Sequence, residues 1–199
     1  MCRKILLAAL LTLIISASIL ASLSVRSSEI KIAYIYPEYA RFSTSLKELE
    51  ENSDIIIKAV VQPGSINFEK TKSIFGYTLT NVQVTKVFSG AVNVGDMLTL
   101  VENYYFQSNE NLQIQADGYA PSKTGEEYIF FLQAYSGDSY KDFWGKYYLV
   151  EAIKGRYPIV EGLSEMEKNS ITNEMLNVSG YIPDTYINLA KDVLEKYIN

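Results

Sequence analysis

The sequence predicts a mostly β protein: a small antiparallel barrel with a leading short helix and a C-terminal helical tail. Two observations predict this fold. Between residues 45 and 161, short runs rich in β-branched and aromatic residues alternate with turns that contain Gly, Asn and Pro, as in an antiparallel sheet closed on itself. Beyond residue 161 the apolar residues recur every three or four positions, which is the period of a helix.

Composition excludes several classes of function. The chain has 199 residues and no His, and its single cysteine is Cys2. Catalysis by Ser-His-Asp or Cys-His groups, His-ligated metals and Cys-ligated zinc are therefore excluded, and we expect neither a metal nor a cofactor. The net charge of −5 leaves no basic surplus for phosphates, so we expect no nucleic-acid partner.

The N-terminus has the pattern of an export signal. Arg3 and Lys4 precede an uncharged, apolar run of 21 residues, 5–25. Positive residues followed by such a run are typical of a secretory signal, but a helix of this length also spans about 30 Å, one hydrocarbon core. Residues 1–27 are therefore either a cleaved signal peptide or an N-terminal membrane anchor. We expect an exported protein, extracellular or at the cell surface, that meets the membrane only through this segment if it is uncleaved.

The chemistry of the remaining chain favours bacterial export. No cysteine follows residue 2, so the exported part has no disulfide and must be held by its core alone. Loss of Arg3, Lys4 and Arg26 with the segment takes the net charge from −5 to −8, which promotes solubility and repels anionic surfaces.

The first elements follow from local patterns. Residues 28–44 are predicted to be an extended lead-in, because apolar side chains alternate from 30 to 36 and favour a short strand. The spacing of Ser45 and Glu48 fits a capping box, which predicts a short helix from 46 to 52. The β-branched run 55–61, ended by Pro63 and Gly64, predicts a buried strand.

The middle of the predicted barrel domain, residues 45–161, contains longer strands. Residues 75–88 predict a long bent strand, because its apolar positions change parity between Leu79 and Val82 and again between Val84 and Val87. One or two β-bulges explain such slips. A strand over 97–105 and a short one at 112–114 follow. Residues 128–132 predict a central strand, because they are apolar on both faces.

The last strands and the tail complete the predicted order. We expect a strand over 144–153 and a short one over 157–160. The tail, residues 162–199, has helical composition from 165 to 176 and a second, amphipathic helix that starts at Pro183 and runs to the terminus. Its apolar stripe is expected to cover one open end of the barrel; docking on another protein is the alternative.

Five of these segments in order carry a resemblance to a known fold. They are SDIIIKAVV (53–61), VTKVFSG (84–90), VGDMLTL (94–100), GEEYIFFL (125–132) and GKYY (145–148). This series resembles poorly characterised exported bacterial domains with a five-stranded OB-type barrel, which is similar to the netrin-like fold of the tissue inhibitors of metalloproteinases. The resemblance covers roughly residues 45–160 and implies an OB-like barrel with an extracellular, non-catalytic role.

The inhibitor mechanism of that fold is not expected here. The metalloproteinase inhibitors place a cysteine-led N-terminus on the protease zinc, and this chain has no cysteine after its signal. We therefore predict that the exported protein does not inhibit zinc proteases through its N-terminus.

Aromatic residues supply the candidate binding site. The chain has 16 Tyr and 8 Phe, and those of the predicted loops 103–125 and 135–145 could stack sugars or peptide groups. The alternative is that tyrosine simply packs well in strands. The aromatics in or beside these loops are Tyr104, Tyr105, Phe106, Tyr119, Tyr135, Tyr140, Phe143 and Trp144; from them we select Tyr104, Tyr105, Tyr119, Tyr140 and Trp144 as candidate ligand-binding residues.

Two functions remain. The first is a non-catalytic extracellular binding or inhibitor-like module, with an extracellular protein or a glycan as its partner. The alternative is a carboxylate-based hydrolase of cell-wall or external polymers, which needs two acids about 5–10 Å apart. Glu126 and Glu127 are adjacent on a predicted strand and so point to opposite faces. We therefore expect no catalytic residues and no enzyme activity.

Overall fold

The computed structural model describes residues 29–35, 43–69, 76–116, 118–137, 141–180 and 183–198. The chain divides into two units, Met1–Ile30 and Lys31–Asn199, and the fold described here is that of the second unit. The predicted export segment, residues 1–27, lies outside the described residues.

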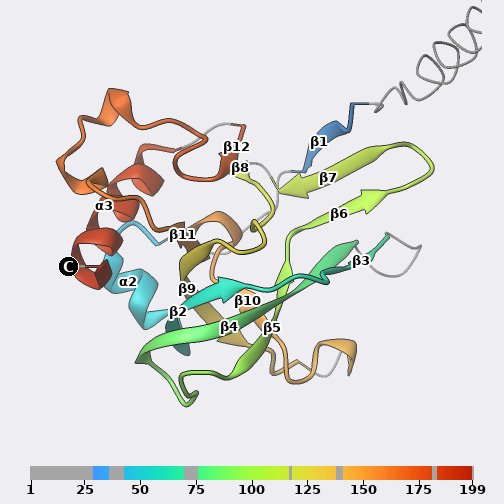
Figure 1. The fold of residues 1–199 in the computed structure, drawn as a ribbon, viewed down its shortest axis with the longest axis horizontal. Coiled ribbons are helices and arrows are strands. Elements are labelled where there is room, and N and C mark those ends of the chain that lie inside the picture. The colour runs from blue at the N-terminus through green and yellow to red at the C-terminus, as the bar shows by residue number, and fades with distance from the viewer. Residues whose placement is uncertain are drawn as a thin grey trace, which may run out of the picture. The chain divides into compact units, whose positions relative to one another are not determined.

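Five strands close into a barrel, which confirms the predicted mostly β fold (Figure 1). The order around the barrel is β5, β4, β2, β9 and β10, and β10 pairs back onto β5. Their bounds are β2 (Ile55–Val61), β4 (Tyr77–Ser89), β5 (Met97–Glu102), β9 (Glu127–Ala134) and β10 (Tyr147–Leu149). The β10–β5 pair is parallel, whereas the other four pairs are antiparallel. This closed five-stranded barrel is compatible with an OB-like barrel.

Strand alternation fills the barrel with side chains. Every second residue of each strand points inward, and the buried inner set is aliphatic and aromatic. It includes Ile57, Ala59, Val61, Val82, Val84, Leu98, Leu100, Tyr128, Phe130 and Leu132. Strand β9 is buried on both faces, as predicted, because its other face carries Ile129 and Phe131 against an outer layer.

The long strand β4 is bulged, although not at both expected places. Its pairing with β2 shifts at two points, which leaves Thr85 and Phe88 as extra residues. The extra residue Thr85 lies within the predicted slip between Val84 and Val87. The slip expected between Leu79 and Val82 is absent, since β4 pairs with β5 in continuous register there. That prediction was wrong because Thr78 and Thr80, although polar, occupy the inward positions.

Two glycines at turns next to β4 provide a matched test of backbone geometry. Gly90 and Gly95 both have positive φ, at +103° and +94°. A Cβ on Gly90 would lie 2.8 Å from the Asp54 carbonyl oxygen, whereas a Cβ on Gly95 would meet nothing within 4 Å. We expect Gly95→Ala to cost about 1–2 kcal/mol of folding stability through backbone strain alone and Gly90→Ala clearly more. Urea unfolding of both variants checks this; equal costs would contradict it.

The short helix forms where its cap predicts. Helix α2 (Leu46–Glu51) begins after Ser45, whose hydroxyl accepts a hydrogen bond from the Glu48 amide at 3.3 Å. The Glu48 carboxylate in turn accepts from the Thr44 amide at 2.7 Å, which lowers the pKa of Glu48. Donors at the helix start are thereby satisfied.

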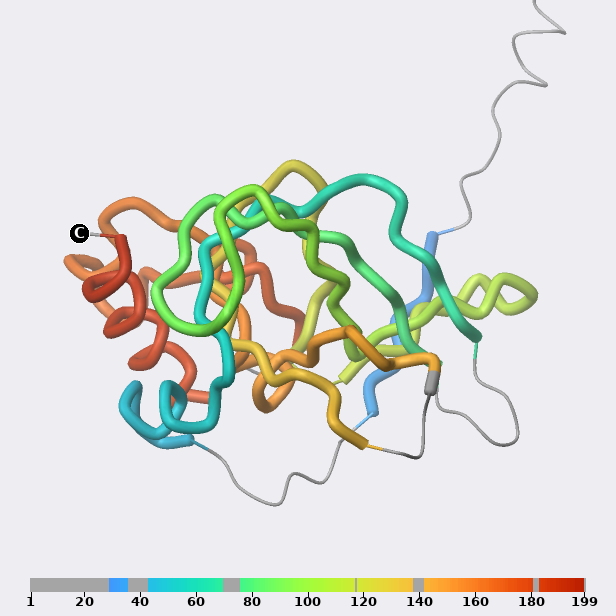
Figure 2. Tube along the Cα trace, turned by 90° about the horizontal axis from the view of Figure 1, so that it is seen from below, coloured from blue at the N-terminus to red at the C-terminus, as the bar shows by residue number. Residues whose placement is uncertain are grey.

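The C-terminal helix α3 (Asp184–Ile198) covers the outer wall of the barrel rather than an open end. Its apolar stripe packs with Ile129 and Phe131 of β9 and with Leu49 of α2 in one buried cluster. Helices α2 and α3 lie together on one side of the barrel (Figure 2), where Lys196 and Tyr197 both bind the Glu50 carboxylate, at 2.6 and 2.7 Å. The stripe is therefore used within the chain itself.

Two predicted elements are shorter or absent. The strand expected over 144–153 is only β10, because Glu151 and Ala152 adopt left-handed conformations and a 3₁₀ turn follows (Ala152–Gly155). This reversal returns the chain to pair β11 (Arg156–Pro158) with β9. The helical composition of 165–176 produces no α-helix. That region contains the 3₁₀ turns Leu163–Glu165 and Lys168–Ser170.

Smaller sheets flank the barrel. The strand expected over 97–105 breaks at Asn103, and β6 (Tyr104–Gln107), β7 (Leu112–Ala116) and β1 (Lys31–Ile35) form a separate three-stranded sheet. Strand β1 confirms the strand predicted in the lead-in. The remaining strands are β3 (Ile66–Phe68), which pairs with β4, and the pair β8 (Gly118–Tyr119) and β12 (Val178–Ser179).

Candidate ligand-binding surface

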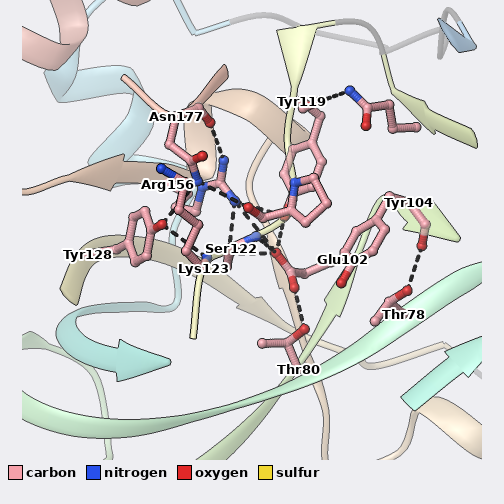
Figure 3. A network of polar contacts seen from close by, with 12 residues as sticks. Thr78, Thr80, Glu102, Tyr104, Tyr119, Ser122, Lys123, Tyr128, Arg156 and Asn177 are labelled. Carbon is pink, nitrogen blue, oxygen red and sulfur yellow. Dashed lines mark hydrogen bonds and ion pairs between the residues drawn. The ribbon is translucent and has the colours of Figure 1, made fainter. Parts of the chain in front are cut away.

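A buried ion pair organises one polar region of the barrel interior (Figure 3). Glu102, the last residue of β5, and Arg156, the first of β11, are almost completely buried and lie 3.6 Å apart. Glu102 also accepts hydrogen bonds from Thr80, Tyr119 and Ser122, the last from the hydroxyl at 2.6 Å. Buried charges persist in a core only when they are paired and hydrogen-bonded in this way.

The guanidinium of Arg156 joins distant segments. It donates to the Asn177 carbonyl and to the Ser122 hydroxyl, both at 2.8 Å. Its charge lies over the rings of Tyr119 and Tyr128, 4.7 and 5.2 Å from their centroids. Because Arg156 and the two tyrosine rings are almost completely buried, the network holds the barrel, the loop around residue 122 and the C-terminal tail together and does not present these side chains to a ligand.

The tyrosines of this network predict instability in alkali. Burial raises the pKa of Tyr128 to about 12, and burial together with the charge of Glu102 raises that of Tyr119. In the unfolded chain tyrosine ionises near pH 10, so the folded state holds these protons more tightly. Stability should be complete below pH 10 and fall as pH rises toward 12.

Urea unfolding from pH 8 to pH 12 measures this loss, and tyrosinate absorbance follows the ionisation itself. In Tyr128→Phe the free energy of unfolding should fall less steeply with pH above pH 10, because one tyrosine with a raised pKa is removed. A stability that stays constant through this range would contradict the prediction.

The structure separates the five aromatic residues selected from the sequence. Tyr104 and Tyr119 stack, with ring centroids 6.4 Å apart, but Tyr119 is fully buried and Tyr105 nearly so. Trp144 is 57% exposed and lies elsewhere, in the turn after the 3₁₀ turn Lys141–Phe143. Tyr140 lies outside the described residues. Of the four that are described, Trp144 is the one that presents most of its side chain to solvent.

A different group of rings packs together next to the turn that carries Trp144. We call Phe68, Tyr77, Tyr135, Phe143 and Tyr148 the aromatic cluster; they come from β3, β4, the loop after β9, the 3₁₀ turn before Trp144, and β10. Phe68 stacks on Tyr77 at 4.7 Å, and Phe143 contacts Tyr77 edge-on at 4.7 Å. Tyr135 meets Phe143 and Tyr148 at 5.6 and 5.5 Å. Edge-to-face packing of this kind buries Tyr77 and Phe143 with Val101 on the outer face of the barrel, while Tyr135 and Tyr148 stay partly exposed around them.

A shallow hollow of about 320 Å³ lies beside the aromatic cluster. It is lined by Asp54, Gln133, Ala134, Tyr135, Ser136, Gly137 and Tyr148. The Asp54 carboxylate accepts the Ala134 amide at 2.9 Å, and the Trp144 indole donates to the Gly137 carbonyl at 3.3 Å. The hollow thus combines two tyrosine rings with a carboxylate, an amide and a hydroxyl, which are groups suited to a polar ligand with an apolar face.

The acids of the described residues form no catalytic pair at this hollow. Asp54 is the single carboxylate among its lining residues. Glu126 lies 3.6 Å from Lys123, whereas Glu127 lies 3.1 Å from Lys58; the two adjacent acids have different partners, as strand alternation predicts. The same residues contain no group of three or more acidic or cysteine side chains placed to hold a metal ion.

No protein-family model matches the chain, and no curated protein is significantly similar to it. Among the described residues no helix is long and apolar enough to cross a membrane, and the predicted anchor, residues 5–25, is not among them.

Sequence reasoning missed part of this surface. Tyr77 and Tyr148 lie within strands and have the ordinary pattern of packing residues, while Asp54 and Gln133 come from the ends of two different strands. One signal was available: Tyr77 and Leu79 alternate with Thr78 and Thr80, and the polar pair faces inward. Inward polar side chains require interior partners, which are the Tyr104 carbonyl for Thr78 and the Glu102 carboxylate for Thr80, and this alternation leaves Tyr77 on the outer face.

Proposed function

We propose that this protein is a non-catalytic binding module that is exported and acts outside the cell through the aromatic cluster and the adjoining hollow. The observation that carries the proposal is the exposed Trp144 at the rim of a hollow whose walls include Tyr135 and Tyr148. Exposed large aromatics fixed by their neighbours are the residues that dominate binding surfaces.

The chemistry of the surface favours a glycan or an extended protein segment. Both ligands have apolar faces that can stack on tyrosine or tryptophan, and both carry donors for the Asp54 carboxylate and acceptors for the Ser136 hydroxyl. The acidic net charge of the chain disfavours nucleic acid. An extracellular protein or a glycan therefore remains the proposed partner.

The hydrolase alternative has less support. Glycoside hydrolysis requires an acid and a second carboxylate about 5–10 Å away in the same pocket, and the described lining of the hollow contributes Asp54 alone. Glu102 is buried and already neutralised by Arg156. We therefore propose binding without catalysis.

The netrin-like relationship is also part of the proposal. Its support is the closed five-stranded barrel together with the ordered segments described from the sequence. The inhibitor mode of that fold, through a terminal cysteine, has no residue in this chain that could carry it. We propose a netrin-like scaffold whose binding surface lies on its side.

Trp144 is the single tryptophan of the chain, so its fluorescence reports directly on this surface. We expect soluble peptidoglycan fragments or chito-oligosaccharides to change its emission on titration with the full chain. Tyr135→Ala should weaken binding about tenfold, because it removes one stacking ring.

Tyr104→Ala is the matched control, because it removes a tyrosine selected from the sequence that lies away from the hollow. It should leave the affinity unchanged, with circular dichroism confirming that both variants fold. Loss of binding in Tyr104→Ala alone would move the site to the loops 103–125. The absence of any response to glycans, with a response to extracellular protein fractions, would assign the partner as protein.

A further inference from the structure

Strand β1 is mostly apolar, and its large side chains are exposed to solvent. Ile32 and Ile35 are 49% and 45% exposed although they point to opposite faces, and Tyr34 between them is 38% exposed. Strand β1 pairs with β7, and no other described strand pairs with its second edge. It is the outer strand of the order β1-β7-β6 and lies beside β7 (Figure 1).

An exposed apolar edge strand is a hazard in free solution. Its unpaired amides and carbonyls, next to β-branched side chains, are a template for pairing with another chain. Soluble proteins normally block such edges with charges or proline; β1 has one charged residue, Lys31 at its start, and the run Ile32–Ile35 carries none. An environment other than bulk water would remove this hazard.

The sequence places an apolar run, long enough to span a membrane, only a few residues before β1. The uncharged run 5–25 ends at Val25, and residues 26–30 separate it from the first residue of β1. Five residues extend at most about 17 Å. If the run spans a bilayer, β1 must therefore begin close to the membrane surface.

We propose that residues 5–25 are retained as a membrane anchor and that β1 lies in the interfacial region of that membrane, with Ile32 and Ile35 in contact with lipid. The interface suits this strand better than the hydrocarbon core, because the free backbone edge still finds water and headgroups there. Tyr34 fits the same position, since tyrosine is enriched at membrane interfaces. Its hydroxyl meanwhile binds the Ser179 hydroxyl at 2.6 Å.

The membrane is a better occupant than a second copy of the chain. Because the anchor tethers β1 beside the membrane, the effective concentration of lipid at the strand is high. Pairing with another β1, in contrast, requires an encounter between two molecules. The net negative charge of the domain opposes such an encounter. It also predicts that zwitterionic lipid suffices, without anionic headgroups.

The test places a fluorophore on β1 in the full chain. Ile32→Trp in a Trp144→Phe background, reconstituted in phosphatidylcholine vesicles, should emit at shorter wavelength and lose most of its emission when the lipid chains are brominated. Val94→Trp in the same background is the matched control, because Val94 is an exposed apolar residue on the β4–β5 turn. Its emission should not respond to brominated lipid.

Each other outcome overturns the proposal. A chain isolated from its native source with a mass that lacks residues 1–27 would show that no anchor is retained. Failure of the full chain to insert into vesicles would do the same. Insertion without quenching at residue 32 would place β1 in water, and a blue shift that depends on protein concentration but not on brominated lipid would show that a second copy covers the strand.

Discussion

Replacing Arg156 by methionine is expected to lower the free energy of unfolding by about 3–5 kcal/mol, because it leaves the buried carboxylate of Glu102 without its counter-charge. The arginine also donates to the Asn177 carbonyl and the Ser122 hydroxyl, so the link between barrel and tail is lost as well. Denaturant unfolding monitored by circular dichroism measures the loss.

The double variant Arg156→Met, Glu102→Gln separates the charge from the packing. With no buried charge left unpaired, it should recover part of the stability lost in the single variant. If the double variant is as unstable as Arg156→Met, the cost comes from the hydrogen bonds to the tail and not from Glu102. If Arg156→Met itself unfolds with near-native stability, the ion pair does not organise the barrel interior.

Replacing Phe131 by alanine should cost about 3–5 kcal/mol. The ring is fully buried between the barrel wall and helix α3, where it contacts Tyr157 and Tyr197 edge-on at 5.8 Å. A cavity there removes contacts from both layers, so hydrogen exchange in α3 should accelerate along with the global loss.

Phe131→Leu and Val94→Ala provide the controls for that experiment. Leucine refills much of the volume and should recover part of the stability, while truncation of the exposed Val94 should change stability by less than about 0.5 kcal/mol. Faster exchange in α3 without a global loss would show that the helix is only loosely attached and that its apolar stripe is available to another protein.

The binding surface needs the barrel but not any single strand. Its rings come from β3, β4 and β10 and from two loops, and the barrel brings these segments together on its outer side. Substitutions that disturb the Arg156 network should therefore weaken ligand binding only as far as they increase the fraction of unfolded molecules. Tyr135→Ala, in contrast, should weaken binding while the protein remains folded. This difference separates residues that position the surface from those that form it.

Local sequence determined most of the elements. The capping residues Ser45 and Glu48 define the start of α2, the β-branched run 55–61 forms β2, and the apolar stripe after Pro183 forms α3. Each of these depends on neighbours within a few positions, through hydrogen bonds or side-chain period. The aromatic content pointed to a binding surface, and Trp144 is part of the one proposed here.

Tertiary structure decided which of these residues face one another. The polar Thr80 lies inside because Glu102 and Arg156, distant in sequence, meet there. Tyr119 is buried for the same reason, although its loop position suggested exposure. The predicted strand 144–153 ends at Leu149 because the chain reverses to pair a second time with β9. Such outcomes depend on long-range pairing and on the cost of an unpaired buried group, and neither quantity is contained in a short stretch of sequence.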